Sequence, residues 1–325
     1  SEIDPATDRV LTFAGARDVT VPPGAELISD AVDFPAAALS DVAVTFHLDA
    51  SPAGETGHPG SRATSYYVHG DATGAAKLTD AKQVDHWYQV SAIDVPAVPG
   101  SSAVVALGDS ITDGHGATTN GNDRWTDVLA AQLQANAQTR NAGVPGIGVS
   151  NQGIGGNHLL TDGLGPNVLA RFDRDVLAPA GVRMVIVFEG VNDLGGLART
   201  GEVPEAEHAA LVARVLAAYR QIVERAHAHG LRVIGGTITP YVGSTYYHPG
   251  PLSEADRQQV NAWIRGAGHF DAVVDFDAVV RDPQHPDRLL PAYDCGDHLH
   301  PSPAGYKAMG EAAYKAVEET VVSGR

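Results

Sequence analysis

Beyond residue 102 the chain alternates short apolar runs with segments whose apolar residues recur every three or four positions. The runs are short and nearly continuous, which is typical of strands buried on both faces of a sheet. The segments between them have the spacing of amphipathic helices. Ser253 is the expected N-cap of one helix, and Pro303 can begin the last one. We predict strands at 103–107, 148–151, 184–188, 231–234 and 272–276, and helices at 125–133, 168–177, 211–223, 253–265 and 303–319. This alternation indicates a parallel sheet of five strands covered by helices on both faces.

Residues 1–95 have a different texture. They are rich in Val, Thr, Pro and Gly, show no long helical periodicity, and contain short β-branched or alternating runs at 19–21, 42–48, 65–68 and 87–93. Such runs favour short strands joined by loops, and residues 96–102 are typical of a connection. We therefore predict a small β-rich N-terminal lobe over residues 1–98 and an α/β domain over residues 99–325. The pattern leaves open whether the lobe folds independently or extends the main sheet.

Composition and charge narrow the possible partners. Of the 325 residues, 43% are hydrophobic and 19% are charged, as in a globular protein with a large core. The formal net charge is −17 and there is no run of Lys or Arg, which argues against nucleic acid as a partner. The apolar runs are too short for a transmembrane helix, so we expect no integral membrane segment. The sequence indicates no particular oligomeric state.

Cysteine usage and the first residues leave the compartment open. The one cysteine, Cys295, cannot form a disulfide within the chain, and we interpret it as an unactivated loop residue because no basic residue is adjacent to it. The first residues lack the pattern of a signal peptide. This fits a cytosolic protein or a secreted one whose signal has been removed, and of the two we favour the secreted protein.

The polar residues that follow the predicted strands form a consistent set. Ligands of an open parallel sheet bind at the carboxyl ends of its strands, so these positions are the first place to look for chemistry. The segments concerned are Gly108–Gly114, Asn151–Asn157, Glu189–Asp193 and Asp297–Pro301. Each alone is typical of a turn, a cap or a surface loop. Together they supply a nucleophile, a base, a carboxylate that can orient the base, and neutral hydrogen-bond donors.

This combination resembles the GDSL, or SGNH, family of serine hydrolases over residues 103–310. The motifs that carry the resemblance are Gly-Asp-Ser-Ile-Thr-Asp-Gly, Gly-Ile-Gly-Gly-Asn, Gly-Val-Asn-Asp and Asp-His-Leu-His-Pro. The resemblance implies the SGNH hydrolase fold, which is a flavodoxin-like three-layer sandwich with a five-stranded parallel sheet. It further implies that Ser110 is the nucleophile, that His300 is the general base, and that Asp297 holds the imidazole.

The resemblance also implies an oxyanion hole made of the backbone N–H of Ser110, the backbone N–H of Gly156 and the side-chain amide of Asn192. Gly155 is the alternative to Gly156, because one sequence does not establish the register of the turn. These residue types suit acyl transfer. A serine hydroxyl needs a base to take its proton, a neutral imidazole can do so near pH 7, and one preorganised oxyanion donor is worth roughly 3–4 kcal/mol. We expect an acyl-serine intermediate, acyl transfer to water and no cofactor.

Rival sites find little support in the sequence. No Gly-x-Ser-x-Gly, Gly-x-Gly-x-x-Gly, P-loop or His-Glu-x-x-His motif occurs, so α/β-hydrolase, nucleotide and zinc sites are not indicated. His227 and His229 lie two positions apart on a predicted helix and face different sides, and we predict no metal site. His298 is expected to face solvent, with pocket contact as the sharper alternative. The remaining loop histidines look scattered: His115, His158, His248 and His285.

Aromatic residues are the candidates for the substrate pocket. Tyr241, Tyr246 and Tyr247 follow the fourth strand at the active edge of the sheet, and we count them with Asp109 and His298 as candidate pocket residues. An ordinary packed loop is the alternative. Four aromatic residues of the N-terminal lobe are expected to pack in strands, with a carbohydrate-stacking platform as the sharper hypothesis: Tyr66, Tyr67, Trp87 and Tyr88.

By analogy with the family, the favoured substrates are small carboxylic esters, acetyl groups on carbohydrate among them. A lipase or thioesterase for longer acyl chains is the alternative, and it is disfavoured because no apolar surface helix or lid is visible. A non-catalytic carbohydrate-binding module is the alternative from another class. Such a module would be expected to lack one of the four side chains that carry the chemistry, and all are present: Ser110, Asn192, Asp297 and His300.

Overall fold

The computed structural model describes residues 2–139 and 146–323, and its contacts divide the chain into two compact units. The larger unit comprises Gly57–Ala63 and Asp85–Arg325, and the smaller one comprises Ser1–Thr56 and Thr64–Val84. The chain therefore visits the larger unit for one short segment before it joins that unit for the rest of its length. The two units are defined by contacts between residues. The predicted boundary between the N-terminal lobe and the α/β domain at residue 98 therefore stays a prediction.

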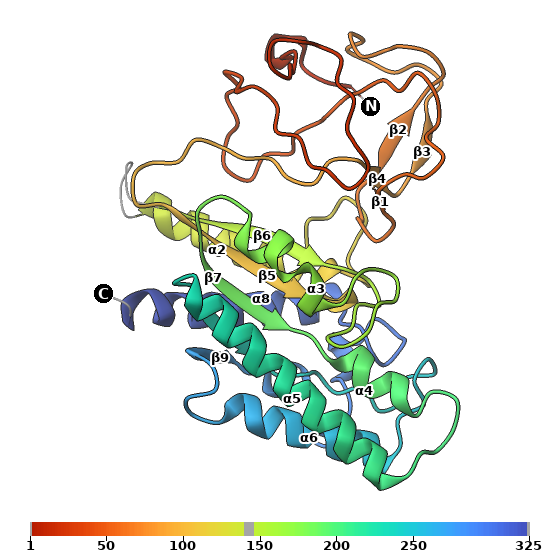
Figure 1. The fold of residues 1–325 in the computed structure, drawn as a ribbon, viewed down its shortest axis with the longest axis vertical. Helices are drawn as coiled ribbons and strands as arrows, with labels where there is room; N and C mark the ends of the chain where they lie inside the picture. The colour runs from red at the N-terminus through yellow and green to blue at the C-terminus, as the bar shows by residue number, and fades with distance from the viewer. Residues whose placement is uncertain (1, 140–145, 324–325) are drawn as a thin grey trace. The chain divides into compact units, whose positions relative to one another are not determined.

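The larger unit is built on a parallel sheet (Figure 1). Within the described residues the strand order is β6-β5-β7-β8-β9. The first of these strands in the chain, β5, therefore lies between the second and the third. The chain runs from β5 to β6 on one side and then crosses to β7 on the other, and such a reversal of strand order creates a crevice at the carboxyl ends of the strands. The strands are β5 Ser102–Gly108, β6 Ile147–Gly153, β7 Val182–Phe188, β8 Arg232–Gly236 and β9 Ala272–Val274. The predicted sheet and the SGNH hydrolase fold are confirmed, with strand ends shifted by at most two residues.

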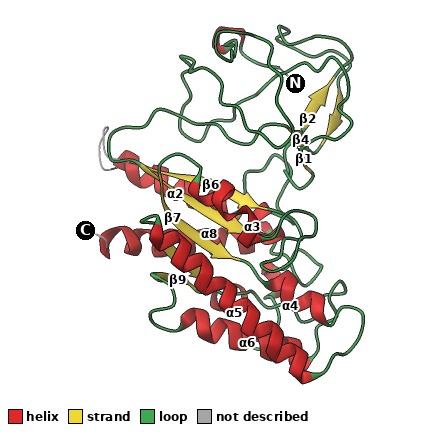
Figure 2. Ribbon diagram, in the orientation of Figure 1, coloured by secondary structure: helices red, strands yellow, loops and turns green. Residues whose placement is uncertain are grey.

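Helices cover both faces of the sheet (Figure 2). On one face α2 packs against α8, and on the other α5 packs against α6. The predicted helices are confirmed, but α6 begins at Pro251 with Gly250 as its cap, so the prediction of Ser253 as the cap is wrong. Proline suits the first helical position because its φ is already helical. None of the described helices has the length and apolar character needed to cross a membrane. The helices are α1 Ser110–Asp113, α2 Trp125–Thr139, α3 Val168–Phe172, α4 Val191–Leu197, α5 Glu205–Ala228, α6 Pro251–Arg265, α7 Phe276–Val280 and α8 Pro303–Ser323, with a π turn at Asp173–Leu177.

The core lies between the sheet and its two helix layers. The central strand residues Val104–Leu107 and Val185–Val187 are no more than 1% exposed. Parallel pairing sets Leu107 opposite Val187, directly before the strand ends. Each fully buried aliphatic side chain contributes about 1.5–3 kcal/mol relative to an exposed one. The apolar strands thereby hold the polar residues that follow them at a defined edge of the sheet.

The smaller unit contains less strand than the sequence pattern predicts. Its described strands are β2 Ser65–Tyr67 and β3 Lys82–Val84, which pair antiparallel, and a 3₁₀ turn lies at Pro5–Thr7. The structure describes residues 19–21 and 42–48 without strand, so those two predictions are wrong. Their apolar side chains remain more than a third exposed, as Val21 at 52% shows. A β-branched run becomes a strand only where it can pack on a half-buried surface. The pair formed by β1 Gly57–His58 and β4 Trp87–Tyr88 belongs to the larger unit.

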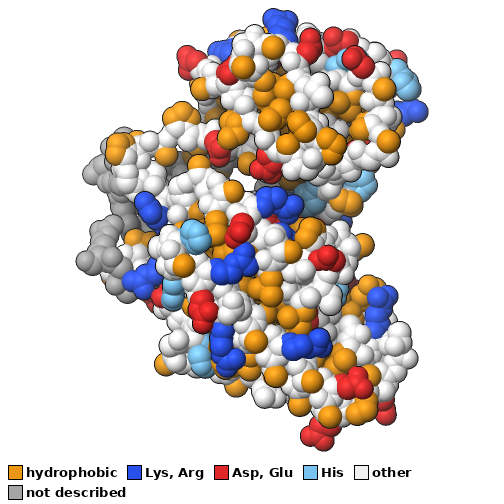
Figure 3. All heavy atoms as spheres, in the orientation of Figure 1, with side chains coloured by type: hydrophobic (Ala, Val, Ile, Leu, Met, Phe, Trp, Pro, Cys, Tyr) orange, Lys and Arg blue, Asp and Glu red, His pale blue; other side chains and the backbone are white. Residues whose placement is uncertain are grey.

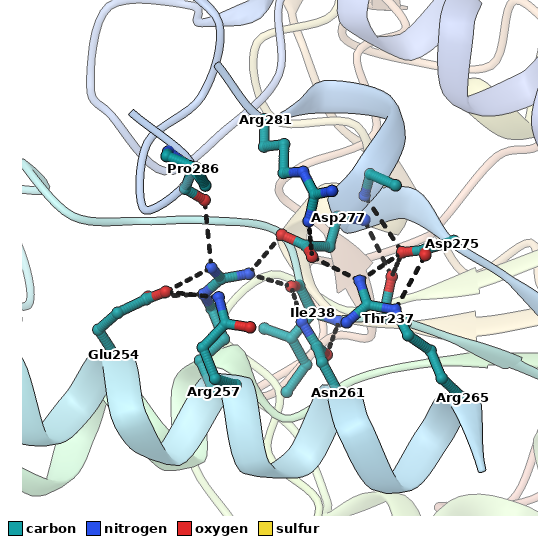
Figure 4. A network of polar contacts seen from close by, with 12 residues as sticks. Thr237, Ile238, Glu254, Arg257, Asn261, Arg265, Asp275, Asp277, Arg281 and Pro286 are labelled. Atoms are coloured by element: carbon teal, nitrogen blue, oxygen red, sulfur yellow. Dashed lines mark hydrogen bonds and ion pairs between the residues drawn. The ribbon is translucent and has the colours of Figure 1, made fainter. Parts of the chain in front are cut away.

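A buried ionic network fastens α6 to the ends of β8 and β9 (Figure 4). The side chains of Arg257 and Asp277 are fully buried, and their charged atoms lie 2.7 Å apart. Arg257 also donates to the Ile238 carbonyl at 3.0 Å and pairs with Glu254. Arg265 approaches the second Asp277 oxygen at 2.5 Å. Because each buried charge has a close partner, the network joins three elements without leaving an isolated ion.

We expect Asp277→Asn to lower the free energy of unfolding by about 3 kcal/mol, because the substitution keeps the shape of the side chain but leaves Arg257 buried with less compensation. Urea unfolding would measure the loss. The matched control is Glu311→Gln, which breaks the exposed pair with Lys307 and should cost no more than about 1 kcal/mol. Equal losses in the two variants would contradict the buried role of Asp277.

Candidate active site

Ser110 lies where β5 ends and a short helix begins. Asp109 caps α1 by accepting a hydrogen bond from the backbone N–H of Ile111 at 2.9 Å. Ser110 is the first residue of that helix and is partly exposed. The helix ends at Gly114, whose φ of 106° lies in the left-handed region that glycine tolerates. The serine hydroxyl is thus held at the carboxyl edge of the sheet.

Two glycines let α1 pack directly on the strand ends. A Cβ added at Gly153, the last residue of β6, would lie 2.2 Å from the backbone nitrogen of Asp113. A Cβ added at Gly108, the last residue of β5, would lie 2.1 Å from Thr112 Oγ1. Any larger residue at either position would displace α1, so the placement of the serine depends on both glycines.

The structure brings Ser110, His300 and Asp297 into one chain of hydrogen bonds. Ser110 Oγ lies 2.8 Å from His300 Nε2, and His300 Nδ1 lies 2.6 Å from Asp297 Oδ2. The other carboxylate oxygen, Asp297 Oδ1, accepts the backbone N–H groups of Leu299 at 2.9 Å and of His300 at 2.8 Å. The loop before α8 therefore fixes the carboxylate and the imidazole relative to each other.

Asp297 is ionised in this setting. Partial burial acts to raise its pKa, but the hydrogen bond and charge of His300, together with the two backbone N–H groups, hold the pKa of Asp297 well below its ordinary value. An ionised carboxylate accepts only, so His300 Nδ1 carries the proton. The Nε2 atom of neutral His300 is then free to accept from the serine hydroxyl.

The glycine-rich turn and Asn192 meet beside the serine. The turn is closed by the Asn157 N–H, which donates to the Ile154 carbonyl at 3.0 Å, and Gly156 inside it has a φ of 71°. Asn192, in the first turn of α4, is buried, and its Nδ2 donates to the Asn157 carbonyl at 2.6 Å. Its Oδ1 accepts from the Tyr247 hydroxyl. The two predicted oxyanion elements are thus joined, and the choice between Gly155 and Gly156 stays open because both lie in this turn.

Arg171 connects the segments that carry the site. Its side chain, from α3, is fully buried. The guanidinium donates to the carbonyls of Gly108 at 3.0 Å and Gln152 at 2.7 Å, and to Asn157 Oδ1 at 2.9 Å. It also pairs with Asp175 at 2.8 Å. No motif marked this arginine in the sequence, because its role depends on carbonyl groups that converge only in the folded sheet.

His115 is a second residue that the sequence analysis missed. Its ring centroid lies 4.0 Å from that of His300, and its Nε2 lies 3.7 Å from Asp297 Oδ2. Arg62 reaches it from residues 57–63, with Nη2 at 3.1 Å from His115 Nδ1. The expectation of a scattered loop residue is wrong. The available signal was its position just past Ser110, beyond Gly114, at the end of the same short helix.

The candidate pocket residues have different environments. Tyr241 is fully buried and packs edge-on to Tyr247, so it belongs to the core. Tyr246 is exposed, with the Arg199 guanidinium 4.0 Å above its ring. His298 is exposed and pairs through Nδ1 with Asp294 at 2.5 Å. Among the three tyrosines, only Tyr247 is described in contact with a predicted oxyanion residue.

Two groups of potential metal ligands occur in the described residues, and both include Asp297. One contains His115 and His300, and the other contains Asp294 and Cys295. Both ring nitrogens of His300 and both oxygens of Asp297 already take part in hydrogen bonds. A cation at the first group would have to replace the hydrogen bonds that connect the histidine to the serine and to the carboxylate.

Three buried acids lie beneath the serine. Burial raises the pKa of Asp109 to about 7, and the nearby Asp193 adds to the effect, while the Ile111 N–H and Arg171 oppose it. Burial also raises the pKa of Glu189 well above its ordinary value, and it raises that of Asp193. The Asp193 carboxylate accepts the N–H groups of the loop after the glycine turn, as at Leu159. The site therefore concentrates carboxyl groups that folding has removed from water, and burial favours their neutral, protonated form.

Comparison with known proteins finds one matching family and several solved structures of similar fold. The sequence matches the GDSL-like lipase/acylhydrolase family over residues 106–308. No curated protein matches the sequence. A structure from Desulfitobacterium hafniense DCB-2, named for the lipolytic G-D-S-L family, is 25% identical with a TM-score of 0.49, covering 66% of this chain and 99% of that one. An acetyl xylan esterase is 19% identical with a TM-score of 0.48, covering 66% and 99%. An M. smegmatis aryl esterase is 15% identical with a TM-score of 0.49, covering 68% and 100%. Likeness of this degree carries no argument about substrate.

The buried Asp109 predicts a pH dependence of stability. Its carboxyl has a pKa of 3.8 when unperturbed and about 7 in the fold, so between these values the folded chain holds a proton that the unfolded chain has released. Stability from this group is therefore lost as pH rises from about 4 to about 7, by up to about 4 kcal/mol. We expect Asp109→Asn, whose amide oxygen can still accept from Ile111, to raise the free energy of unfolding at pH 8 and to change it little at pH 4.

Urea unfolding at the two pH values would test this expectation. Asp18→Asn is the control, since Asp18 is exposed. An Asp109→Asn protein that is less stable than the parent at pH 8 would contradict the assignment.

Proposed function

Because the chain belongs to the GDSL-like lipase/acylhydrolase family and is a carboxylic ester hydrolase of that type, we propose that it hydrolyses esters of small acyl groups with Ser110 as its nucleophile. The observation that carries the proposal is the continuous chain from Ser110 Oγ through His300 to Asp297, at 2.8 Å and 2.6 Å. Nucleophile, base and orienting carboxylate in this order are the parts that serine acyl transfer requires.

The reaction proceeds in two acyl transfers. Ser110 Oγ attacks the ester carbonyl carbon as its proton passes to His300 Nε2, and the carbonyl electron pair moves to oxygen. The tetrahedral intermediate collapses as His300 returns the proton to the leaving alcohol, and the acyl group remains on Ser110. Water then repeats the sequence and releases the acid. Ionised Asp297 stabilises the imidazolium that forms in each half.

The oxyanion that develops needs donors beside the serine. We assign this role to the backbone N–H groups of Ser110 and Gly156, with Gly155 as the alternative, and to the side-chain amide of Asn192. The Asn192 amide has two N–H bonds, one of which donates to the Asn157 carbonyl, so the second is available. Tyr247 supports the assignment because its hydroxyl donates to Asn192 Oδ1 and so distinguishes the two ends of the amide. One such donor is worth roughly 3–4 kcal/mol.

The surroundings of the serine favour a short acyl group over a long one. The side chains hydrogen-bonded to Ser110 Oγ and to the Asn192 amide are polar, namely those of His300 and Tyr247. The apolar side chain described beside Gly156, Leu164, is exposed and forms no enclosed wall. The space beside Asn192 is filled by Tyr247, whose ring packs so closely on α4 that a Cβ at Gly195 would lie 2.5 Å from it. A long acyl chain requires a continuous apolar wall. A lipase or thioesterase activity is the alternative that the same assay tests.

An exposed tryptophan supports carbohydrate as the alcohol part of the substrate. Trp87 is 40% exposed, so the expectation that it packs in a core is wrong. Its ring lies edge-on to His58 at 4.9 Å, and His58 Nε2 lies 2.5 Å from Asp113 Oδ1 on α1, the helix that begins with Ser110. Trp87 is thus linked through His58 to the helix of the nucleophile, and an exposed aromatic ring can stack on a sugar ring. We therefore propose acetylated carbohydrate as the substrate class.

We expect the protein to hydrolyse p-nitrophenyl acetate faster than butyrate, octanoate or palmitate, and Ser110→Ala to reduce kcat/KM by at least about 10⁴-fold. The exposed Ser40→Ala variant is the control, and circular dichroism confirms folding. A serine-dependent preference for long chains would move the assignment to the lipase or thioesterase alternative. Activity retained by Ser110→Ala would refute the mechanism. Release of acetate from acetylated oligosaccharides, at a lower rate in Trp87→Ala than in the parent, would support acetylated carbohydrate as the substrate class.

Tyr247→Phe should lower kcat about 10-fold and leave KM within about twofold. The ring keeps its packing on α4, but Asn192 loses the hydroxyl that orients it, and transition-state stabilisation depends on such preorganisation. Tyr246→Phe, one position away and exposed, is the matched control and should retain parental rates. A larger effect on KM than on kcat would argue that Tyr247 serves substrate binding instead.

A further inference from the structure

Two histidines share one carboxylate oxygen at the proposed active site. Asp297 Oδ2 accepts from His300 Nδ1 at 2.6 Å, and His115 Nε2 lies 3.7 Å from the same oxygen. The two rings are tilted by 35°, with centroids 4.0 Å apart. If both rings were positively charged they would repel each other and compete for Asp297. The arrangement of His300 and Asp297 is therefore maintained only while His115 is neutral.

Arg62 favours the neutral form of His115. Its Nη2 lies 3.1 Å from His115 Nδ1, and a guanidinium can only donate. His115 Nδ1 must then be the acceptor, which requires a neutral ring that carries its proton on Nε2. That N–H lies on the side of Asp297 Oδ2. Burial, His300 and Arg62 together lower the pKa of His115, whereas Asp297 and Asp113 act to raise it.

Residues 57–63 hold Arg62 at this position. Its carbonyl accepts the backbone N–H of Asn120 at 2.8 Å. The neighbouring Ser61 carbonyl accepts from Arg124, and His58 binds Asp113 on α1. Arg62 itself has a φ of 51°, in the left-handed region that costs a residue with a Cβ about 1 kcal/mol or more. The surrounding contacts keep the backbone in a conformation that it would not adopt alone.

We propose that Arg62 is a positioning residue for the catalytic base: it keeps His115 neutral and turned toward Asp297, so that His300 is the one imidazole that takes up a proton during turnover. The proposal rests on the function proposed above for Ser110 and His300. His115 acts through its neighbours and is not the base, because the hydrogen bond to Ser110 Oγ comes from His300.

The proposal predicts how turnover depends on pH. In the parent protein His300 is the one imidazole whose protonation removes activity on the acid side, so log kcat/KM should rise with a slope of one. Asp109 is present in every variant, so its own titration does not distinguish them. Without Arg62, His115 can also take up a proton, and its charge would oppose proton transfer from Ser110 to His300. Turnover would then require two neutral rings, and the slope should approach two.

The experiment measures kcat/KM for p-nitrophenyl acetate between pH 5 and pH 8.5 in Arg62→Met, Arg62→Lys, His115→Phe and the double variant Arg62→Met/His115→Phe. We expect Arg62→Met to lose about 10-fold relative to the parent at pH 5.5 and less than about threefold at pH 8.5. Arg62→Lys, which keeps a cationic donor, and the double variant, which has no second imidazole, should both return to a slope of one. A uniform loss in Arg62→Met at every pH, with a slope of one, would overturn the proposal.

Nitrogen-15 NMR of the histidine rings gives a readout that does not depend on catalysis. The His115 signals are identified by their absence in His115→Phe. We expect His115 at pH 6 to be neutral with its proton on Nε2 in the parent, and its protonated fraction to be larger in Arg62→Met. Protonated His115 in the parent at pH 6 would overturn the proposal even if the enzyme is active. Ser110→Ala assayed in parallel separates this outcome from failure of the proposed function, because that variant leaves the histidine signals in place and removes only turnover.

Discussion

The active edge of the sheet depends on one buried guanidinium. Arg171 donates to the carbonyl of Gly108 at the end of β5, to that of Gln152 one residue before the end of β6, and to the side chain of Asn157. It thereby joins the strand before the nucleophile to the strand and turn that present the proposed oxyanion donors. Buried backbone carbonyls need hydrogen-bond donors, and that of Gly108 accepts both the Ile154 N–H and the Arg171 guanidinium, each at 3.0 Å. A neutral side chain could satisfy one or two of them. The five donors of a guanidinium reach three segments at once, and Asp175 supplies a compensating charge at 2.8 Å.

The active site is built over three carboxyl groups whose burial costs free energy. Asp109, Glu189 and Asp193 are withdrawn from water beneath the serine, and burial raises the pKa of each. Their useful contribution is geometric, since Asp109 caps the helix of the nucleophile and Asp193 holds the loop after the glycine turn. The apolar strands and the ionic network around Arg257 offset the cost elsewhere in the same unit. Stability and site geometry are thus supplied by different parts of one sheet.

The sequence predicts features that depend on a local pattern of residues. It misses contacts between residues that are distant in the chain and meet only in the folded protein. The strands β5, β7, β8 and β9 follow from short apolar runs, whereas β6 is largely polar. The Asp297–His300 contact follows from three residues of separation on one loop. Ser110 and His300 are 190 positions apart, yet their meeting was predictable because both adjoin elements of known placement in the fold. Arg171, Arg62 and His115 carry no motif, and their partners are backbone atoms or rings from distant segments. The runs at 19–21 and 42–48 failed for the opposite reason, since a local β pattern found no surface to pack on.

The route of the chain also limits how the N-terminal portion can be gained or lost in evolution. Residues 57–63 belong to the unit that carries Ser110, while the residues on either side of them belong to the other unit. The smaller unit is therefore interrupted by a segment that supplies His58 and Arg62 to its neighbour. A recombination event that removed everything before residue 99 would excise both side chains with it. The N-terminal portion cannot be gained or lost as a detachable module, as a tethered binding domain can, without rebuilding the rim of the catalytic centre. Residues 57–63 should consequently change together with the residues around Ser110 that they contact.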